Sequence, residues 1–298
     1  MNEEIREINK QQGEPAATGT LYLVTTPIGN LEDLTPRAAR ILEEVDLIAA
    51  EDTRHTRKLL AYLGIQQRII SYYREKEQER AEMLLKHLHN GENIAVVSDA
   101  GTPGLSDPGT VLVAEAVAAG IRVVPVPGGS ACLAALVASG LPTHRFVFEG
   151  FLPRKPKEKK ARLNALADEE RTIVLYEAPH RLTETLRLLA QELGPERPVV
   201  IARELTKKFE EFWRGALAEA VRVWSVREVR GEFTLVLAGR SPEAKEEPEA
   251  ADYERFCQEV RARCEAGEKA SAVIRDIAQR ESLSRSALYQ YYQKRKGD

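Results

Sequence analysis

The sequence predicts an α/β fold: a first domain with a largely parallel sheet, a second α/β domain with a mixed sheet, and a small helical domain at the C-terminal end. The first observation behind this prediction is that short apolar runs alternate with segments of helical period through residues 20–140. The second is that three of the runs end in loops rich in Gly and Pro, within residues 25–30, 98–109 and 127–131. Such loops let backbone approach a ligand closely, although Gly and Pro also mark ordinary strand-to-helix turns.

In the first domain the apolar runs predict strands, and the helical period predicts the helices between them. Ser130 is placed to cap the last of these helices. Because the carboxyl ends of parallel strands share one edge of a sheet, we expect the three loops to converge on a small-molecule pocket. The expected strands cover 20–25, 46–50, 68–71, 93–98 and 122–126, and the expected helices cover 35–44, 53–63, 75–90, 108–119 and 130–138.

The pattern loosens between residues 141 and 160, and residues 151–157 are predicted to form an exposed linker or an active-site loop. The shorter strands that follow indicate a second α/β domain with some antiparallel pairing. A ligand between two such domains is a common arrangement. The expected strands are 172–176, 198–202, 209–214 and 232–238, and the expected helices are 180–193 and 215–224.

The C-terminal segment has apolar residues at helical spacing on both sides of a short break, within 272–278 and 282–289, which is typical of a helix-turn-helix. Its second helix would carry Arg285, Tyr289 and Tyr292, with Lys294, Arg295 and Lys296 at its end, and would bind nucleic acid; a helical appendage used for packing or dimerisation fits the same pattern. The predicted boundaries are a tail 1–18, domains 19–140 and 141–240, a polar linker 241–251 and a helical domain 252–298.

Composition restricts the class of protein. With 298 residues and 43% hydrophobic content the chain can bury more than one core, and its net charge of −3 confines any RNA contact to local patches. Cys132, Cys257 and Cys264 lack metal-site spacing and indicate reduced thiols and no bound metal. Without an apolar run that could span a membrane or form a signal core, the expected location is the cytoplasm.

Six motifs in order along the chain resemble those of the tetrapyrrole-methylase superfamily, over roughly residues 20–240. Within it, the pattern is similar to the bacterial enzymes that 2′-O-methylate a cytidine ribose in the decoding region of 16S ribosomal RNA. The motifs are Thr-Pro-Ile-Gly-Asn (26–30), Glu-Asp-Thr-Arg (51–54), Ser-Asp-Ala-Gly-Thr-Pro-Gly-Leu-Ser-Asp-Pro-Gly (98–109), Pro-Gly-Gly-Ser-Ala (127–131), Tyr-Glu-Ala-Pro-His-Arg (176–181) and Gly-Glu-Phe-Thr (231–234).

This resemblance implies S-adenosylmethionine as the methyl donor, 16S ribosomal RNA as the substrate, presented by the small ribosomal subunit, and a homodimer. It also implies which residues hold the donor, largely through their backbone. The expected donor-pocket residues are Pro27, Ile28, Gly29, Asp99, Ala100, Gly101, Ser130, Ala131, Phe151, Tyr176 and Ala178.

A ribose hydroxyl is a weak nucleophile that gains from a general base. The candidates are Glu177, His180, Glu204 and Asp107. An Asp before Pro in a Gly-rich loop more often braces a turn, and His180 equally fits a solvated charge at the start of a helix. Alignment and desolvation of the reacting atoms could also suffice without a base.

RNA binding needs cations that contact phosphates. Residues 154–162 carry six cations against Glu158, beside the expected pocket, although a charge run is often only a solvated face. Arg54, with Arg37, Arg57 and Lys58, would extend the track. The expected RNA contacts are Arg54, Arg154, Lys155, Lys157, Lys159 and Lys160.

Two other functions fit parts of the sequence. One is a small-molecule methylase of the same superfamily that acts on a tetrapyrrole precursor, against which the basic segment and the helical domain argue. The other is a non-enzymatic regulator that binds nucleic acid through residues 252–298 and a nucleotide-like ligand in the sheet. Transfer of a methyl group to RNA distinguishes the leading hypothesis from both.

Overall fold

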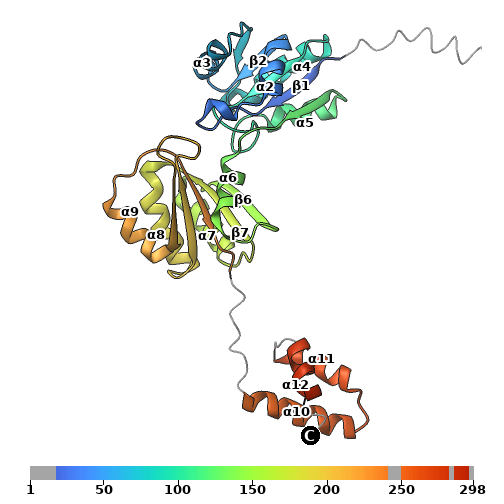
Figure 1. Cartoon of the computed structure of the whole chain (residues 1–298). Helices are drawn as coiled ribbons and strands as arrows, with labels where there is room; N and C mark the ends of the chain where they lie inside the picture. The colour runs from blue at the N-terminus through green and yellow to red at the C-terminus, as the bar shows by residue number, and fades with distance from the viewer. Residues whose placement is uncertain (1–17, 241–249, 282–284, 295–298) are drawn as a thin grey trace, which may run out of the picture. The chain divides into compact units, whose positions relative to one another are not determined.

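The computed structural model describes residues 18–240, 250–281 and 285–294 (Figure 1). The chain divides into two compact units, residues 1–239 and residues 240–298, and each is described by itself. Of the predicted tail and linker, the structure describes only residues 18, 250 and 251. Ser282, Arg295 and Lys296 also lie outside the described residues. The predicted division of the first unit at residue 140 stays a prediction.

The first sheet of unit 1 is entirely parallel, which confirms the predicted fold class. All residues of β2 and β4 are buried, as expected for strands covered on both faces. Its strands are β1 (Thr20–Val24), β2 (Leu47–Ala50), β3 (Ile69–Ser71), β4 (Ile94–Val97) and β5 (Arg122–Val126), in the order β3-β2-β4-β1-β5.

Helices cover both faces of this sheet. Leu84 and Leu112 pack with Leu21 and Val96 on one face, beneath α4 and α5, while Leu42 and Leu60 of α2 and α3 pack on the other. Thr35 and Asp52 cap α2 and α3 through their side chains. The helices are α2 (Pro36–Glu44), α3 (Thr53–Leu63), α4 (Glu77–His89) and α5 (Thr110–Ala118), with short 3-10 helices η1 (Leu31–Asp33) and η2 (Arg74–Lys76).

The second sheet is mixed: β6 and β7 are parallel, and the other neighbours are antiparallel. On one face Val174 and Val236 pack against Cys132 and Leu136 of α6, so a helix that follows the first sheet covers the second. α7, α8 and α9 cover the other face. The strands are β6 (Phe146–Phe151), β7 (Thr172–Glu177), β8 (Pro198–Arg203), β9 (Glu211–Ala216) and β10 (Phe233–Leu237), in the order β6-β7-β10-β8-β9; the helices are α6 (Ala131–Ser139), α7 (Pro156–Ala167), η3 (Pro179–Arg181), α8 (Leu182–Leu193) and α9 (Leu217–Val226).

The loosened pattern between residues 141 and 160 did not predict β6 or the start of α7. Of the residues 151–157 expected as an exposed linker or active-site loop, 152–155 do form a loop, while Phe151 ends β6 and residues 156 and 157 begin α7. β6 lies at the sheet edge and is bulged between Phe148 and Gly150, which interrupts its alternation. α7 begins with polar residues and buries only Leu163 and Leu166, so its apolar period is weak. The apolar periodicity of β6 and of α7 is therefore too weak to predict either element from the sequence.

The described residues of unit 2 form three helices around their own apolar core, which includes Phe256, Ile274 and Leu288. Tyr292, which the second helix was expected to present to nucleic acid, lies in this core and is only 6% exposed, so it is not available for such a contact; Tyr289 is 47% exposed. The helices are α10 (Ala250–Glu265), α11 (Ala270–Arg280) and α12 (Arg285–Lys294).

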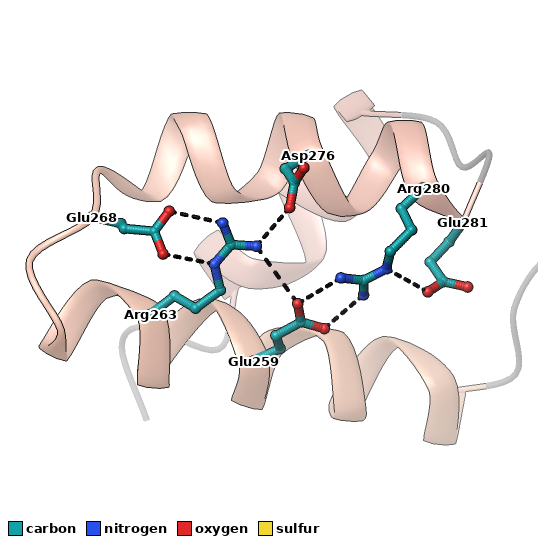
Figure 2. A network of polar contacts seen from close by, with 6 residues as sticks. All are labelled: Glu259, Arg263, Glu268, Asp276, Arg280 and Glu281. Carbon is teal, nitrogen blue, oxygen red and sulfur yellow. Dashed lines mark hydrogen bonds and ion pairs between the residues drawn. The ribbon is translucent and has the colours of Figure 1, made fainter.

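Two arginines tie α10 to α11 and to the turn between them (Figure 2). Arg263 pairs with Glu268 at 2.7 Å and Asp276 at 2.6 Å, and Arg280 pairs with Glu259 at 2.8 Å. The hydrogen bond and charge of Arg280 lower the pKa of Glu259. The pairs are partly or fully exposed, so they orient the helices while the apolar core supplies most of the stability.

Trp224 is expected to be the most sensitive core position of unit 1. It is 1% exposed and packs edge-to-face on Phe233 at 5.3 Å, so Trp224→Ala should lower the free energy of unfolding by about 3–5 kcal/mol. Its indole Nε1 has no hydrogen-bond partner among the described residues. Trp224→Phe should therefore cost much less, since it keeps an aromatic ring there and removes an unsatisfied donor. Calorimetric unfolding of the full chain checks both; equal losses would contradict the argument.

Candidate active site

A pocket of about 400 Å³ lies where the first sheet's strands end, within the range typical of small-molecule sites. Residues that follow β1, β2, β4 and β5 form one wall, and residues of the second sheet form the other. The lining residues are Ile28, Glu51, Asp99, Ala100, Gly101, Thr102, Leu105, Ser106, Asp107, Ser130, Ala131, Phe151, Tyr176, Glu177, Ala178, Pro179, Leu205, Glu232, Phe233 and Thr234.

Backbone hydrogen bonds join the loops after β1 and β4 beside the pocket. Thr26 N–H donates to the Gly101 carbonyl at 2.9 Å, and Gly101 N–H donates to the Thr26 carbonyl at 3.0 Å. Gly101 has a φ of +81°, which lies in the left-handed region that other residues rarely adopt. The predicted convergence of loops that follow β1, β4 and β5 is therefore what the structure shows.

Tyr176 on β7 connects the two walls. Its hydroxyl oxygen accepts the Cys132 backbone N–H at 3.1 Å, in the first turn of α6, and its ring packs on Phe148 and Phe151. Burial raises the pKa of Tyr176 to about 12. The Ser130 hydroxyl, expected to cap α6, makes no capping bond, so that part of the prediction is wrong: a tyrosine 44 residues from Cys132 satisfies the helix start instead.

The pocket is acidic. Glu51, Asp99, Asp107, Glu177 and Glu232 line it, and no lysine, arginine, histidine or cysteine is among the lining residues that the structure describes. Burial raises the pKa of Glu51, and burial together with the Glu51 charge raises that of Asp107 to about 7. Such a lining favours a positively charged ligand.

The buried carboxylate of Glu177, a candidate base, is committed to hydrogen bonds. Its oxygens accept the Ala178 N–H at 2.8 Å and the Thr185 hydroxyl at 2.6 Å, and the Arg181 Nε lies at 3.5 Å. Arg181 in turn donates to the Leu152 carbonyl at 3.0 Å. Glu177 therefore holds the 178–181 segment beside the pocket, which is a positioning role.

Glu177→Ala is expected to reduce thermal stability and ligand binding together. It leaves the Thr185 hydroxyl and the Ala178 N–H without their acceptor, which should cost about 2–4 kcal/mol of unfolding free energy. Glu177→Gln keeps an acceptor oxygen and should cost less. Calorimetric unfolding checks the stabilities, and titration with S-adenosylhomocysteine checks the pocket; unchanged stability in the alanine variant would contradict the positioning role.

Of the other three candidate bases, Asp107 lines the pocket, and His180 and Glu204 do not. His180 is exposed on η3. Glu204 accepts the Glu232 N–H and the Lys207 ammonium, each at 3.0 Å. Partial burial would raise the pKa of Glu204, but Lys207 and the Glu232 amide together lower it, so this carboxylate is a poor proton acceptor.

Of the predicted donor-pocket residues, Pro27 and Gly29 do not line the pocket and the other nine do. Gly29 instead approaches another loop: a Cβ there would lie 2.5 Å from Lys207 Cγ. Sequence reasoning missed Glu51, Leu205 and the start of β10. Glu51 could have been found, because it begins the motif at 51–54, and Phe233 lies in the motif at 231–234 and begins β10. Leu205 follows the end of β8.

The predicted RNA contacts fall into two groups. Arg154, Lys157 and Lys160 are exposed at or near the start of α7, and none makes an ion pair within the described chain. Lys155 pairs with Glu158 at 3.1 Å, and Arg54 pairs with Asp52 at 2.7 Å. Lys159 is only 12% exposed and pairs with Glu184 at 3.0 Å, so its charge is largely neutralised.

In the described part of the chain no group of three His, Cys, Asp or Glu side chains is arranged to hold a metal ion, and no helix there is long and apolar enough to cross a membrane. Cys132 and Cys257 are buried, and Cys264 is partly buried.

The chain resembles known methyltransferases in sequence and fold. Ribosomal RNA small subunit methyltransferase I of Synechocystis sp. is 52% identical over 272 residues, 91% of this chain and 96% of that protein. The protein of the same name from Escherichia coli O157:H7 is 43% identical over 293 residues, 97% of this chain and all of that one.

Solved structures of methyltransferases share the fold. Uroporphyrin-III C-methyl transferase from Thermus thermophilus, complexed with S-adenosylhomocysteine, is 25% identical with a TM-score of 0.52, and the match covers 74% of this chain and 97% of that one. The methyltransferase CobJ is 23% identical with a TM-score of 0.58, covering 75% and 95% of the two chains.

The tetrapyrrole (corrin/porphyrin) methylase family model matches residues 20–221. With this match and relatives similar over nearly its whole length, the chain belongs to the tetrapyrrole methylases and, within them, to the family of ribosomal RNA small subunit methyltransferase I.

Proposed function

We propose that the protein transfers a methyl group from S-adenosylmethionine to the ribose 2′-hydroxyl of a cytidine in the decoding region of 16S ribosomal RNA. The observation that carries the proposal is the acidic pocket at the strand ends, in a chain 52% identical to a ribosomal RNA small subunit methyltransferase over 91% of its length. The cytidine and the ribose position rest on the resemblance of the motifs at 26–30, 98–109 and 176–181.

The pocket fits the donor on size and charge. S-adenosylmethionine carries a positive sulfonium, and five carboxyl side chains line a pocket of about 400 Å³. Gly101 lines this pocket with a φ of +81°, so its backbone reaches the pocket without a side chain in the way. Ile28, Gly101 and Ala131 would hold the donor largely through backbone and small side chains, with Phe151 and Tyr176 closing the other wall.

When bound, S-adenosylmethionine supplies an electrophilic methyl group on its sulfur. The protein's own task is to align the acceptor oxygen with that group and to exclude water, because methyl transfer is an in-line displacement. The rigid loops after β1, β4 and β5 provide the alignment. The aromatic wall of Phe151 and Tyr176 excludes water from the reacting atoms.

The acceptor RNA would approach from the side of α7. Phe151 lines the pocket, and the exposed cations Arg154, Lys157 and Lys160, which form no ion pair with the residues that the structure describes, follow it within nine residues. Cations near a pocket position RNA by contacting phosphates. The proposal also includes a cytoplasmic homodimer that acts on the assembled small ribosomal subunit.

The test is transfer of labelled methyl from S-adenosylmethionine to small ribosomal subunits that lack this modification, with the labelled nucleotide mapped. Ribose 2′-O-methylation makes the adjacent linkage resistant to alkali, so we expect label in 16S RNA at one alkali-resistant cytidine. No label in RNA, from protein that binds S-adenosylhomocysteine, would refute the proposal and favour a small-molecule methylase. Label on a base would refute the ribose assignment alone.

A further inference from the structure

Asp107 differs from the other carboxyl groups of the pocket because, within the described residues, its oxygens neither accept a backbone N–H nor form an ion pair. Asp99 Oδ1 accepts the Asp52 N–H at 3.0 Å, Glu51 Oε2 accepts the Asp99 N–H at 3.3 Å, and Glu177 is committed as described. Glu232 pairs with Lys207. No backbone N–H of the described residues donates to the Asp107 carboxyl, so the expectation that it braces its own turn is wrong; the Gly104 N–H to Pro108 carbonyl bond closes that turn.

The turn that carries Asp107 is strained and held from three sides. Ser106 has a φ of +70°, a left-handed conformation that costs a residue with a side chain about 1–2 kcal/mol. Arg74 donates to the Ser106 carbonyl, and Gly150 on β6 leaves room for the Ser106 hydroxyl, since a Cβ at Gly150 would lie 2.5 Å from it. Glu77 accepts the Gly109 N–H at 2.8 Å. Strain that is maintained by this many contacts marks a turn whose conformation serves a function.

The charged and titratable groups around Asp107 favour a carboxyl that exchanges a proton near neutral pH. Burial and the Glu51 charge raise its pKa to about 7, Asp99 acts in the same direction, and Arg74 and the Ser98 hydroxyl oppose them. Tyr176 faces it across the pocket with a pKa raised to about 12 and accepts the Cys132 N–H, so it does not compete for protons. A general base is most effective with a pKa near the working pH.

We propose that Asp107 is the general base that accepts the proton of the substrate hydroxyl. This inference rests on the proposed function. The hydroxyl oxygen forms a bond to the donor's methyl carbon, the bond between that carbon and the sulfonium sulfur breaks with its electron pair on sulfur, and the hydroxyl proton moves to the Asp107 carboxylate. One positive and one negative charge disappear in this step, which a partly buried pocket favours.

The test measures single-turnover methyl transfer to unmodified small subunits from pH 5.5 to 8.5, for the wild type, Asp107→Asn and Asp107→Glu. Because only the ionised carboxylate accepts a proton, the wild-type rate should rise with pH and level off above about 7. Asp107→Asn should be slower by about 100-fold or more and lose this rise. Asp107→Glu should recover part of the rate and its pH dependence.

Calorimetric titration with S-adenosylhomocysteine on the same preparations gives a readout independent of turnover. We expect its affinity to change less than about threefold in Asp107→Asn, because the product is a neutral sulfide. Asp33→Asn removes an exposed carboxylate on η1 and should match the wild type in rate and affinity.

Three outcomes would overturn the inference. If Asp107→Asn keeps the wild-type rate and pH profile, Asp107 is not the base. If it loses S-adenosylhomocysteine binding together with rate, Asp107 maintains the pocket instead. If the wild type itself places no label on a ribose hydroxyl, the proposed function fails first and the inference with it, a result visible before any variant is compared.

Discussion

Gly101→Val is expected to weaken S-adenosylhomocysteine binding by about 10- to 100-fold. Gly101 lines the pocket with a φ of +81°, where a β-branched residue is strained. A Cβ there would make an ordinary contact, 3.4 Å from Ile28 Cγ2, so the two further methyl groups of valine are what would occupy space in the pocket. Overpacking by this amount typically costs about 1–3 kcal/mol, which corresponds to the stated loss of affinity.

Gly64→Val is the matched control for this substitution. Gly64 ends α3 with a φ of +71°, and a Cβ there meets nothing within 4 Å. Both variants therefore pay a similar conformational penalty, but only Gly101 lines the pocket. Titration of both variants with S-adenosylhomocysteine, with unfolding followed in parallel, checks the prediction. Equal affinity of the two variants would show that the donor does not bind against Gly101.

Neutralising the exposed cations at and just before the start of α7 is expected to lower RNA methylation strongly and to leave donor binding intact. The variant replaces Arg154, Lys157 and Lys160 with glutamine. Each cation that no longer binds a phosphate reduces the slope of log affinity against log salt by close to one unit, so three should flatten that slope by about 2–3. At physiological salt the methylation rate at limiting subunit concentration should fall by about 10- to 100-fold.

The control for net charge replaces Lys86, Arg122 and Arg222 with glutamine. These cations are exposed and make no ion pair within the described chain, and Arg122 begins β5 at the sheet edge opposite the pocket. The control should retain the wild-type rate and salt slope. The same loss in both triple variants would mean that overall charge, and not the α7 surface, attracts the RNA.

The local pattern of the chain determines much of the fold. In the first domain, strands and helices lie where hydrophobic period and caps place them, as with β5 at 122–126 and α3 at 53–63. The edge strand β6 was not predicted from the sequence because a bulge near Gly150 breaks its alternation. The helix α7 was not predicted because its first turns are charged. Local signals fail where an element's burial is set by distant neighbours.

The hydrogen bonds and ion pairs of the folded chain show which candidate catalytic and RNA-binding side chains are already held by a partner. Glu177, Glu204 and Lys159 have suitable chemistry, but each is satisfied by a partner: Thr185, Lys207 and Glu184. The turn of Asp107, in contrast, depends on two distant residues. Arg74, 33 residues away, donates a hydrogen bond to the Ser106 carbonyl, and Gly150, 43 residues away, leaves room for the Ser106 hydroxyl. Turn chemistry and hydrophobic period act locally, so the α/β fold, the family and the loops that meet at the pocket could be predicted from the sequence. Hydrogen-bond partners and burial come from segments far apart in the chain, so the folded structure was needed to show which pocket carboxyl is not committed to a backbone N–H or to a cation.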